Sequence, residues 1–214
     1  METKTKAVIN WHYRLRQLCE GALFIALAEI LSFLPLYRLP WGGSIDFAML
    51  PIILFCVRWG FGPGMIASCA HAILQTLFEG GIAIGWQSIL GDFLIAYAVM
   101  GIAGLFKGRF CIAATVACAA RFLVHYVVGA TIWAEYMPEQ FFGMTMTTPW
   151  FYSALYNGAY MLPDLLLILA VYVLLKKHLC QHILKRIKRM PHRYRWGVSL
   201  LVLHPDNTHA GGIV

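Results

Sequence analysis

The sequence predicts an all-α membrane protein with six transmembrane helices and both termini in the cytoplasm. Composition is the first reason: 60% of the 214 residues are apolar and 13% are charged, against about 45–50% and about 25% in a soluble domain. A single water-soluble core of this length has too much surface relative to its volume to bury so many apolar side chains. The apolar residues also form long continuous runs, which favour helices over the alternating segments of a membrane β-barrel.

Six runs are expected to cross the bilayer, whose core needs roughly 20 apolar residues per helix. Pro35 and Pro40 end the first run, the glycines and proline of residues 60–64 form a turn before the third, and Glu79-Gly80-Gly81 ends the third. The expected spans lie at about 19–37, 47–59, 65–78, 86–106, 110–133 and 150–175.

The charges in the connections fix the expected orientation. Arg38 is the only basic residue in the connections after spans one, three and five. The opposite side carries Lys4, Lys6, Arg14, Arg16, Arg58, Lys107, Arg109 and a cluster from Lys176 to Arg195. Because basic connections stay in the cytoplasm, both termini are expected there, and the chain is expected to be a multi-pass protein of the cell membrane.

Residues 1–176 are expected to form the six-helix membrane domain, and residues 177–214 a basic cytoplasmic tail. Eight Lys or Arg residues alternate with apolar ones between Lys176 and Arg195. This pattern is typical of a helix lying on an anionic leaflet, and equally of a simple topology determinant. The basic residues cluster between apolar runs rather than along one face, so no nucleic-acid partner is expected. The six cysteines form no C-x-x-C pair, and no metal site is expected.

Ionisable residues inside a bilayer are costly and usually mark a function or a partnered pair. Glu20 and Asp164 lie near the ends of their spans, where reaching the interface is a sufficient explanation. Glu29 lies deeper, and its role is left open. His71, in the middle of the third span, is expected to hydrogen-bond to a neighbouring helix.

The fifth span carries Arg121, His125, Gly129 and Trp133 at four-residue intervals. At about 100° per residue, the last three fall on one stripe roughly 80° wide that climbs about 12 Å toward the outer surface. An imidazole, a gap without a side chain and an indole would suit a ring-shaped ligand. An interfacial tryptophan above a small-residue packing contact is the alternative, and the stripe alone leaves both open.

Two other spans add polar groups in the same outer half of the membrane. The fourth span brings Asp92 followed by Phe93, and the sixth brings Tyr152, Tyr156, Asn157 and Tyr160. A carboxylate supplies charge, aromatic rings supply cation–π stacking, and an amide supplies both a donor and an acceptor. Together with the stripe they predict a site for a cationic, planar ligand that forms hydrogen bonds.

Several stretches of the chain resemble a known family. They are residues 20–28, 43–51, 101–106, 121–133 and 152–158. The most specific are the last two, which begin Arg121-Phe122-Leu123-Val124-His125 and Tyr152-Ser153-Ala154-Leu155-Tyr156-Asn157-Gly158. They resemble the S-components of energy-coupling factor (ECF) vitamin transporters, in particular the thiamine-specific ThiT type, over about residues 15–176.

The resemblance implies a six-helix subunit that captures thiamine at the outer side and docks on a transmembrane coupling subunit with ATPase subunits. Thiamine is then the transported ligand, and no catalytic residue, cofactor or metal is expected. The implied substrate-binding residues are Trp41, as a gating aromatic, with Asp92, Phe93, His125, Gly129, Trp133, Tyr152 and Asn157. An Ala-x-x-x-Ala pattern, here Ala22 and Ala26, implies the docking surface, because small residues let another helix approach closely.

Other functions stay open. Asp92 is one methylene shorter than the Glu usual in the family, and Phe93 replaces a common Tyr, so the ligand could be another small aromatic vitamin or a precursor such as a hydroxymethylpyrimidine. An intramembrane enzyme would use His125 with Asp92 or Arg121, but the sequence has no H-E-x-x-H, paired Asp or suitably placed Ser motif. A packing protein that binds no ligand is the last alternative.

Overall fold

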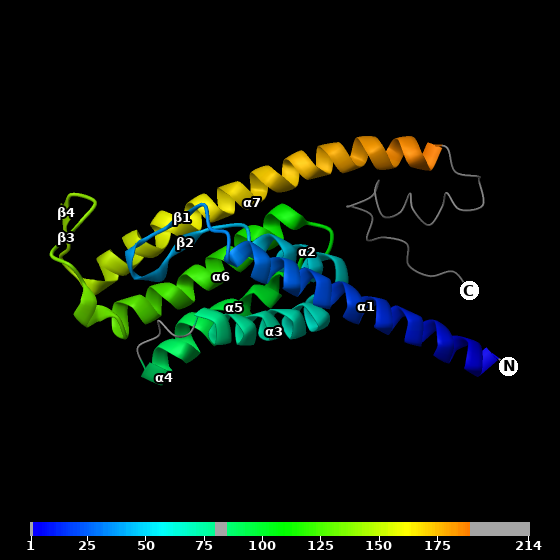
Figure 1. Ribbon diagram of the computed structural model, residues 1–214, viewed down its shortest axis with the longest axis horizontal. Helices are drawn as coiled ribbons and strands as arrows, with labels where there is room; N and C mark the ends of the chain where they lie inside the picture. The colour runs from blue at the N-terminus through cyan, green and yellow to red at the C-terminus, as the bar shows by residue number, and fades with distance from the viewer. Residues whose placement is uncertain (1, 80–84, 189–214) are drawn as a thin grey trace. The chain divides into compact units, whose positions relative to one another are not determined.

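The computed structural model describes residues 2–79 and 85–188, with side chains over 11–40, 42–79 and 85–176. The chain divides into two compact units, Met1–Ile168 and Leu169–Val214. Within the described residues it forms six helical segments and two short hairpins (Figure 1). The last helix passes from the first unit into the second.

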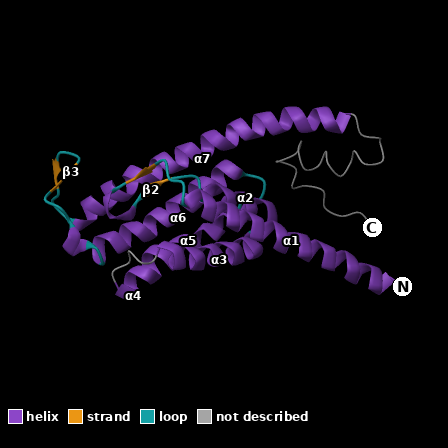
Figure 2. Cartoon of the chain, in the orientation of Figure 1, coloured by secondary structure: helices purple, strands orange, loops and turns teal. Residues whose placement is uncertain are grey.

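Helices make up most of the described chain, and the short strands lie only in the connections between them (Figure 2). They are α1 (Glu2–Ser32), α2 (Met49–Trp59), α3 (Phe61–Glu79), a fourth segment of four pieces, α6 (Phe110–Thr131) and α7 (Pro149–Lys188). The four pieces are α4 (Gly85–Ser88), the π-helical η3 (Ile89–Ile95), α5 (Ala96–Ala98) and the 3-10 helix η4 (Val99–Leu105).

Short elements occupy two of the connections. The antiparallel hairpin of β1 (Tyr37–Arg38) and β2 (Ser44–Ile45), with the 3-10 turn η1 (Pro40–Gly42) between its strands, joins α1 to α2. The turn η5 (Ala134–Tyr136) and the hairpin of β3 (Gln140–Phe141) and β4 (Met144–Thr145) join α6 to α7.

Close packing in the first unit centres on η4, which contacts α2, α3 and α6. Two glycines allow this approach. A Cβ on Gly104 would lie 2.5 Å from the carbonyl carbon of Gly60, and one on Gly101 would lie 2.4 Å from Met65 Sδ. The absence of side chains at these two positions therefore sets how near η4 lies to the junction between α2 and α3.

The predicted helical fold is confirmed. By length and composition, three helices of the described chain are apolar enough to cross a membrane: Gly85–Leu105, Phe110–Thr131 and Pro149–Lys176. They correspond to spans four, five and six. α2 is a shorter apolar helix of 11 residues. Six crossings and the orientation of the termini stay predictions.

Several helix ends differ from the expected span ends. The first helix begins at Glu2, well before the expected span, and ends at Ser32, five residues before the expected end at Tyr37. The third begins at Phe61, so that Pro63 lies in its first turn, where an absent N–H needs no partner; Gly60 alone, at φ +89°, makes the reversal from α2. α7 continues to Lys188, and its apolar stretch, Pro149–Lys176, agrees with the expected sixth span. The division at residue 176 stays a prediction, and residues 189–214 of the tail lie outside the described residues.

A buried polar cluster joins α1 to α3. The His71 Nδ1–H donates to Glu29 Oε1 at 2.7 Å, and Gln75 Nε2 donates to Glu29 Oε2 at 2.9 Å and to Ser32 Oγ at 3.0 Å. All four residues are buried. The hydrogen bond expected for His71 is therefore confirmed, and Glu29 acts as its partner.

The two carboxylates near span ends differ. The Glu20 side chain is 22% exposed and accepts hydrogen bonds from Arg16, Arg58 and Trp59, where α1 meets α2. Asp164 is 3% exposed and accepts the backbone N–H of Asp46 at 2.9 Å. The interfacial position expected for Asp164 is therefore wrong, because this carboxylate holds the connection before α2.

Candidate functional site

A pocket in the first unit lies between α6, the start of α7, the η3–α5 region and residues 42–44. Its empty space is about 1060 Å³, including open solvent at the mouth. The lining includes seven of the eight expected substrate-binding residues: Asp92, Phe93, His125, Gly129, Trp133, Tyr152 and Asn157. The side chain of Trp41 lies outside the described residues. The structure therefore brings the seven together, and their binding role stays a prediction.

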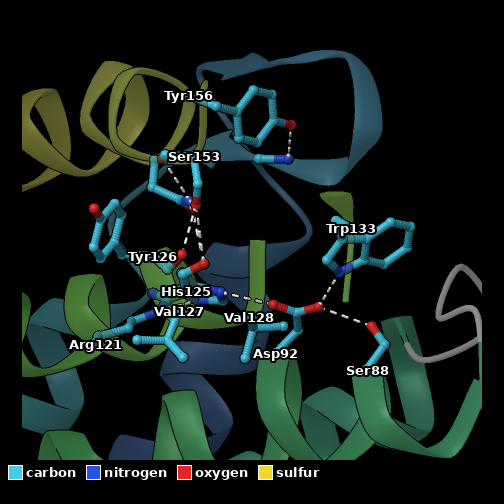
Figure 3. Close-up of polar contacts among 12 residues, drawn as sticks. Ser88, Asp92, Arg121, His125, Tyr126, Val127, Val128, Trp133, Ser153 and Tyr156 are labelled. Atoms are coloured by element: carbon cyan, nitrogen blue, oxygen red, sulfur yellow. Dashed lines mark hydrogen bonds and ion pairs between the residues drawn. The ribbon is translucent and has the colours of Figure 1, made fainter. Parts of the chain in front are cut away.

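Asp92 is the centre of the polar contacts in this pocket (Figure 3). Its Oδ2 accepts the indole N–H of Trp133 at 2.6 Å and the hydroxyl of Ser88 at 2.8 Å. Its Oδ1 accepts from His125 Nδ1 at 3.2 Å. One carboxylate thus orients both rings of the predicted stripe, and all three hydrogen bonds are made within the protein.

The π-helical turn of η3 gives Asp92 its position. A π-helical turn inserts an extra residue into a helix and turns the following side chains, and such turns are frequent at functional sites. Gly91 precedes Asp92, and a Cβ there would lie 2.6 Å from Val128 Cγ2. Because Gly91 has no side chain, η3 lies close enough to α6 for Asp92 to reach His125.

The α6 stripe fixes the proton of His125. Arg121 Nε donates to His125 Nε2 at 3.3 Å, so this nitrogen is an acceptor. The ring proton of a neutral imidazole then lies on Nδ1, which donates to Asp92. The Arg121 guanidinium lies 4.1 Å from the centre of the Tyr97 ring, a cation–π contact below His125.

Gly129 is a packing position as well as part of the pocket wall. A Cβ on Gly129 would lie 2.4 Å from Ser153 Oγ on α7. Ser153 in turn donates its hydroxyl to the Tyr126 carbonyl at 2.8 Å. The gap in the stripe therefore lets α7 approach α6, which agrees with the packing alternative for this residue.

Two predicted binding residues of α7, Asn157 and Tyr152, make contacts within the protein. Asn157 Nδ2 donates to the Ser153 carbonyl at 2.9 Å, and Asn157 Oδ1 accepts the Tyr160 hydroxyl at 2.7 Å. Asn157 Nδ2 also donates to the His125 carbonyl of α6 at 3.4 Å, so the amide joins α7 to α6. Tyr152 packs edge-on against Phe141, with ring centres 5.5 Å apart.

Sequence reasoning placed Tyr156 and Tyr160 among the polar groups of the sixth span and named Arg121 at the start of the four-residue series in the fifth. It omitted the rest of the lining, namely Gly42, Gly43, Ser44, Glu79, Ser88, Tyr97, Tyr136 and Ser153. One signal was present for Ser88, which lies one helical turn before Asp92. Arg121 was left out of the predicted stripe because of the drift of about 40° per step.

The lining has charge of both signs and many rings. Asp92 and Glu79 are its acids and Arg121 is its base, while Trp133, Tyr136 and four further tyrosines contribute aromatic faces. Among the described residues, no group of three His, Cys, Asp or Glu is placed to hold a metal ion. The arrangement is therefore suited to hold a flat, partly charged organic molecule by stacking and hydrogen bonds.

Ala22 and Ala26 lie away from this pocket. Both are exposed on α1, next to the exposed side chains of Leu23 and Leu27. The small-residue surface predicted from the sequence is therefore present on the outside of the helix bundle, and its docking role stays a prediction.

The similarity to known proteins covers most of the chain. Residues 18–184 match the family described as Thiamine transporter protein (Thia_YuaJ). The chain is 28% identical over 185 residues to the thiamine transporter ThiT of Bacillus subtilis (78% of this chain, 93% of the relative). It is 25% identical over 169 residues to ThiT of Lacticaseibacillus paracasei (69% and 80%).

A solved structure of ThiT from Listeria monocytogenes has the same fold, with a TM-score of 0.66 at 23% identity over 76% of this chain and 94% of that one. The three apolar helices and the transport function of the matched family agree that this is a multi-pass membrane protein. From residue 18 to residue 184, the chain belongs to the thiamine transporter family.

Proposed function

We propose that this chain is the substrate-capture subunit of an ECF-type importer, and that it binds thiamine in the Asp92 pocket. Thiamine joins a positively charged thiazolium ring to an aminopyrimidine ring. The observation that carries the proposal is the Asp92 carboxylate held between the rings of Trp133 and His125. A carboxylate beside aromatic faces favours a flat cation by charge and by stacking.

The distribution of basic residues supports capture from outside. They lie at the end of the bundle opposite the pocket: Arg58 is in the last turn of α2, and Arg109 precedes α6. His125 and Trp133 belong to the second half of α6 and the residues just after it. If basic ends face the cytoplasm, the pocket faces the outside, and both termini are cytoplasmic. Energy then comes from a coupling subunit with ATPase subunits, the partners implied by the resemblance.

A neutral pyrimidine is the second candidate ligand. Asp92 already accepts three hydrogen bonds from protein donors, so much of its charge is compensated before any ligand binds. A hydroxymethylpyrimidine would use the stacking surfaces without needing that charge. Tight binding of this compound together with weak binding of thiamine would favour the second candidate.

The deciding experiment is a thiamine titration of the purified protein, followed by tryptophan fluorescence and by calorimetry. A saturable quench is expected. Trp133→Ala should lose the quench and weaken binding by about 1–2 kcal/mol, since a ring contact is lost. Trp11→Ala is the matched control, because Trp11 is 65% exposed on α1 and does not line the pocket. A flat titration of the folded wild-type protein would overturn the proposal, and equal affinity of both variants would exclude Trp133.

The docking surface is tested separately. Ala22→Trp places a large ring where a helix of the coupling subunit would lie, so co-purification with the transmembrane and ATPase subunits is expected to be lost while thiamine binding stays unchanged. Leu123→Trp, at a 59% exposed position of α6, is the control and should co-purify normally. Normal co-purification of Ala22→Trp would exclude this surface.

A further inference from the structure

One side chain of α7 holds the connection between α1 and α2 against the pocket. The Tyr156 hydroxyl accepts the backbone N–H of Gly43 at 3.1 Å (Figure 3) and donates to the carbonyl of Pro40. These bonds join residues 113 and 116 positions apart in sequence. The segment they hold, residues 40–44, contributes Gly42, Gly43 and Ser44 to the pocket wall.

A second residue on the same face of α7, Asp164, also holds the connection between α1 and α2. Tyr156, Tyr160 and Asp164 follow at four-residue steps and lie on one face of the helix. Asp164 accepts the Asp46 N–H in a fully buried hydrogen bond, whereas the bond from Tyr156 to Pro40 is exposed. The Asp46 side chain also accepts from Ser44 Oγ and Ala48 N, both at 2.8 Å. The Asp164 end is therefore the firm anchor, and the Tyr156 end is the one that water can reach.

The two glycines of residues 40–44 differ in how closely they are packed. Gly42 has φ +102°, a conformation that glycine adopts without strain, and a Cβ there would meet nothing within 4 Å. Gly43 instead lies on the ring of Tyr160, where a Cβ would be 2.7 Å from Cδ1. The Tyr156 ring also packs against Phe141 of β3, with centres 5.8 Å apart. Tyr156 thus contacts the α1–α2 connection and the α6–α7 connection.

We propose that Tyr156 is a positioning residue that sets how fast ligand enters and leaves the pocket, by holding residues 40–44 closed. The inference rests on the proposed function for the identity of the ligand. Both hydrogen bonds use only protein atoms, so they stabilise the closed segment in free and ligand-bound protein alike. Loss of the hydroxyl should therefore speed entry and exit together and leave the affinity nearly constant.

The kinetic test uses Tyr156→Phe, which keeps the ring and removes both hydrogen bonds. In stopped-flow fluorescence with thiamine, the association and dissociation rate constants are both expected to rise on the order of tenfold, the factor for two ordinary hydrogen bonds. The Kd should change by less than about threefold. Tyr126→Phe is the matched control, since Tyr126 does not line the pocket, and its rates should equal those of the wild type.

A second variant reaches the same segment from the other side. Gly43→Ala keeps Tyr156 but drives a methyl group into the Tyr160 ring, so it should also speed both rates. Unchanged rates in both variants would overturn the proposal. A higher Kd caused by faster dissociation alone would also overturn it, because Tyr156 would then be a ligand contact.

A measurement without ligand separates this proposal from the proposed function. Residue-resolved hydrogen exchange of the free protein should show a faster Gly43 amide in Tyr156→Phe and an unchanged Asp46 amide, which Asp164 still holds. An unchanged Gly43 amide would overturn the closing role of Tyr156. If the wild type failed to bind thiamine, the proposed function would fall, and the exchange of Gly43 would still decide whether Tyr156 holds the segment.

Discussion

Asp92→Asn is expected to weaken thiamine binding by about 1.5–3 kcal/mol, roughly 10- to 150-fold, the range for hydrogen bonds to a charged group. The substitution removes the negative charge and turns one acceptor oxygen into an NH₂ donor. Asp92 accepts from Trp133, Ser88 and His125, so one of these donors then faces another donor. The ring that should stack on the ligand and the charge that should attract it are lost together.

Two controls separate the charge of Asp92 from the hydrogen bonds by which it orients Trp133 and His125. Ser88→Ala removes one donor and keeps the charge, so its effect should stay below about tenfold. Calorimetry with thiamine and with neutral hydroxymethylpyrimidine then isolates the charge: Asp92→Asn should weaken the cation more than the neutral ring. Equal losses for both ligands would show that Asp92 only orients Trp133 and His125, and no loss would remove it from the site.

Gly104→Ala is expected to destabilise the folded protein by about 1–3 kcal/mol or more, as overpacking a tight core does. The new Cβ would lie 2.5 Å from the Gly60 carbonyl carbon and 2.6 Å from the Gly60 carbonyl oxygen. These are backbone atoms, so no side-chain rotation relieves the contact. η4 would have to move away from the start of α3.

Gly158→Ala is the matched control for this substitution. It lies in α7, and a Cβ there would meet nothing within 4 Å. Alanine also favours helix over glycine by about 0.8–1.0 kcal/mol, so this variant should be as stable as the wild type or more so. Thermal unfolding in detergent compares the two. Equal midpoints for Gly104→Ala and the wild type would show that η4 is loosely packed.

The helical fold followed from the composition and from the length of the apolar runs. A chain of this size cannot bury so many apolar residues in a water-soluble core, and long continuous apolar runs favour membrane helices. The helix boundaries did not follow in the same way. Pro63 looked like part of a turn, but a proline is compatible with the first turn of a helix, and only φ at Gly60 distinguishes the two. The π-helical turn around Asp92 was also invisible, because it depends on how η3 packs against α6.

Helical spacing predicted which pocket residues of one helix lie together. His125 and Gly129 share a face because of the period of α6, and Trp133 follows just after the helix ends at Thr131. The partners of each group were not predictable, because they come from other helices. Asn157 seemed suited to contact ligand but bonds within its own helix and to α6, and Tyr156 acts on residues more than 100 positions away.

The Glu29–His71 pair couples α1 to α3 through two ionisable side chains. α1 and α3 are not among the three described helices that are apolar enough to cross on their own. Facing lipid separately, each would expose an ionisable side chain to hydrocarbon, at a cost of a few kcal/mol. Side by side, the His71 Nδ1–H donates to the Glu29 carboxylate, while His71 Nε2 and Gln75 Oε1 have no hydrogen-bond partner among the described residues. In hydrocarbon, this contact therefore favours α1 and α3 packed together over either helix alone.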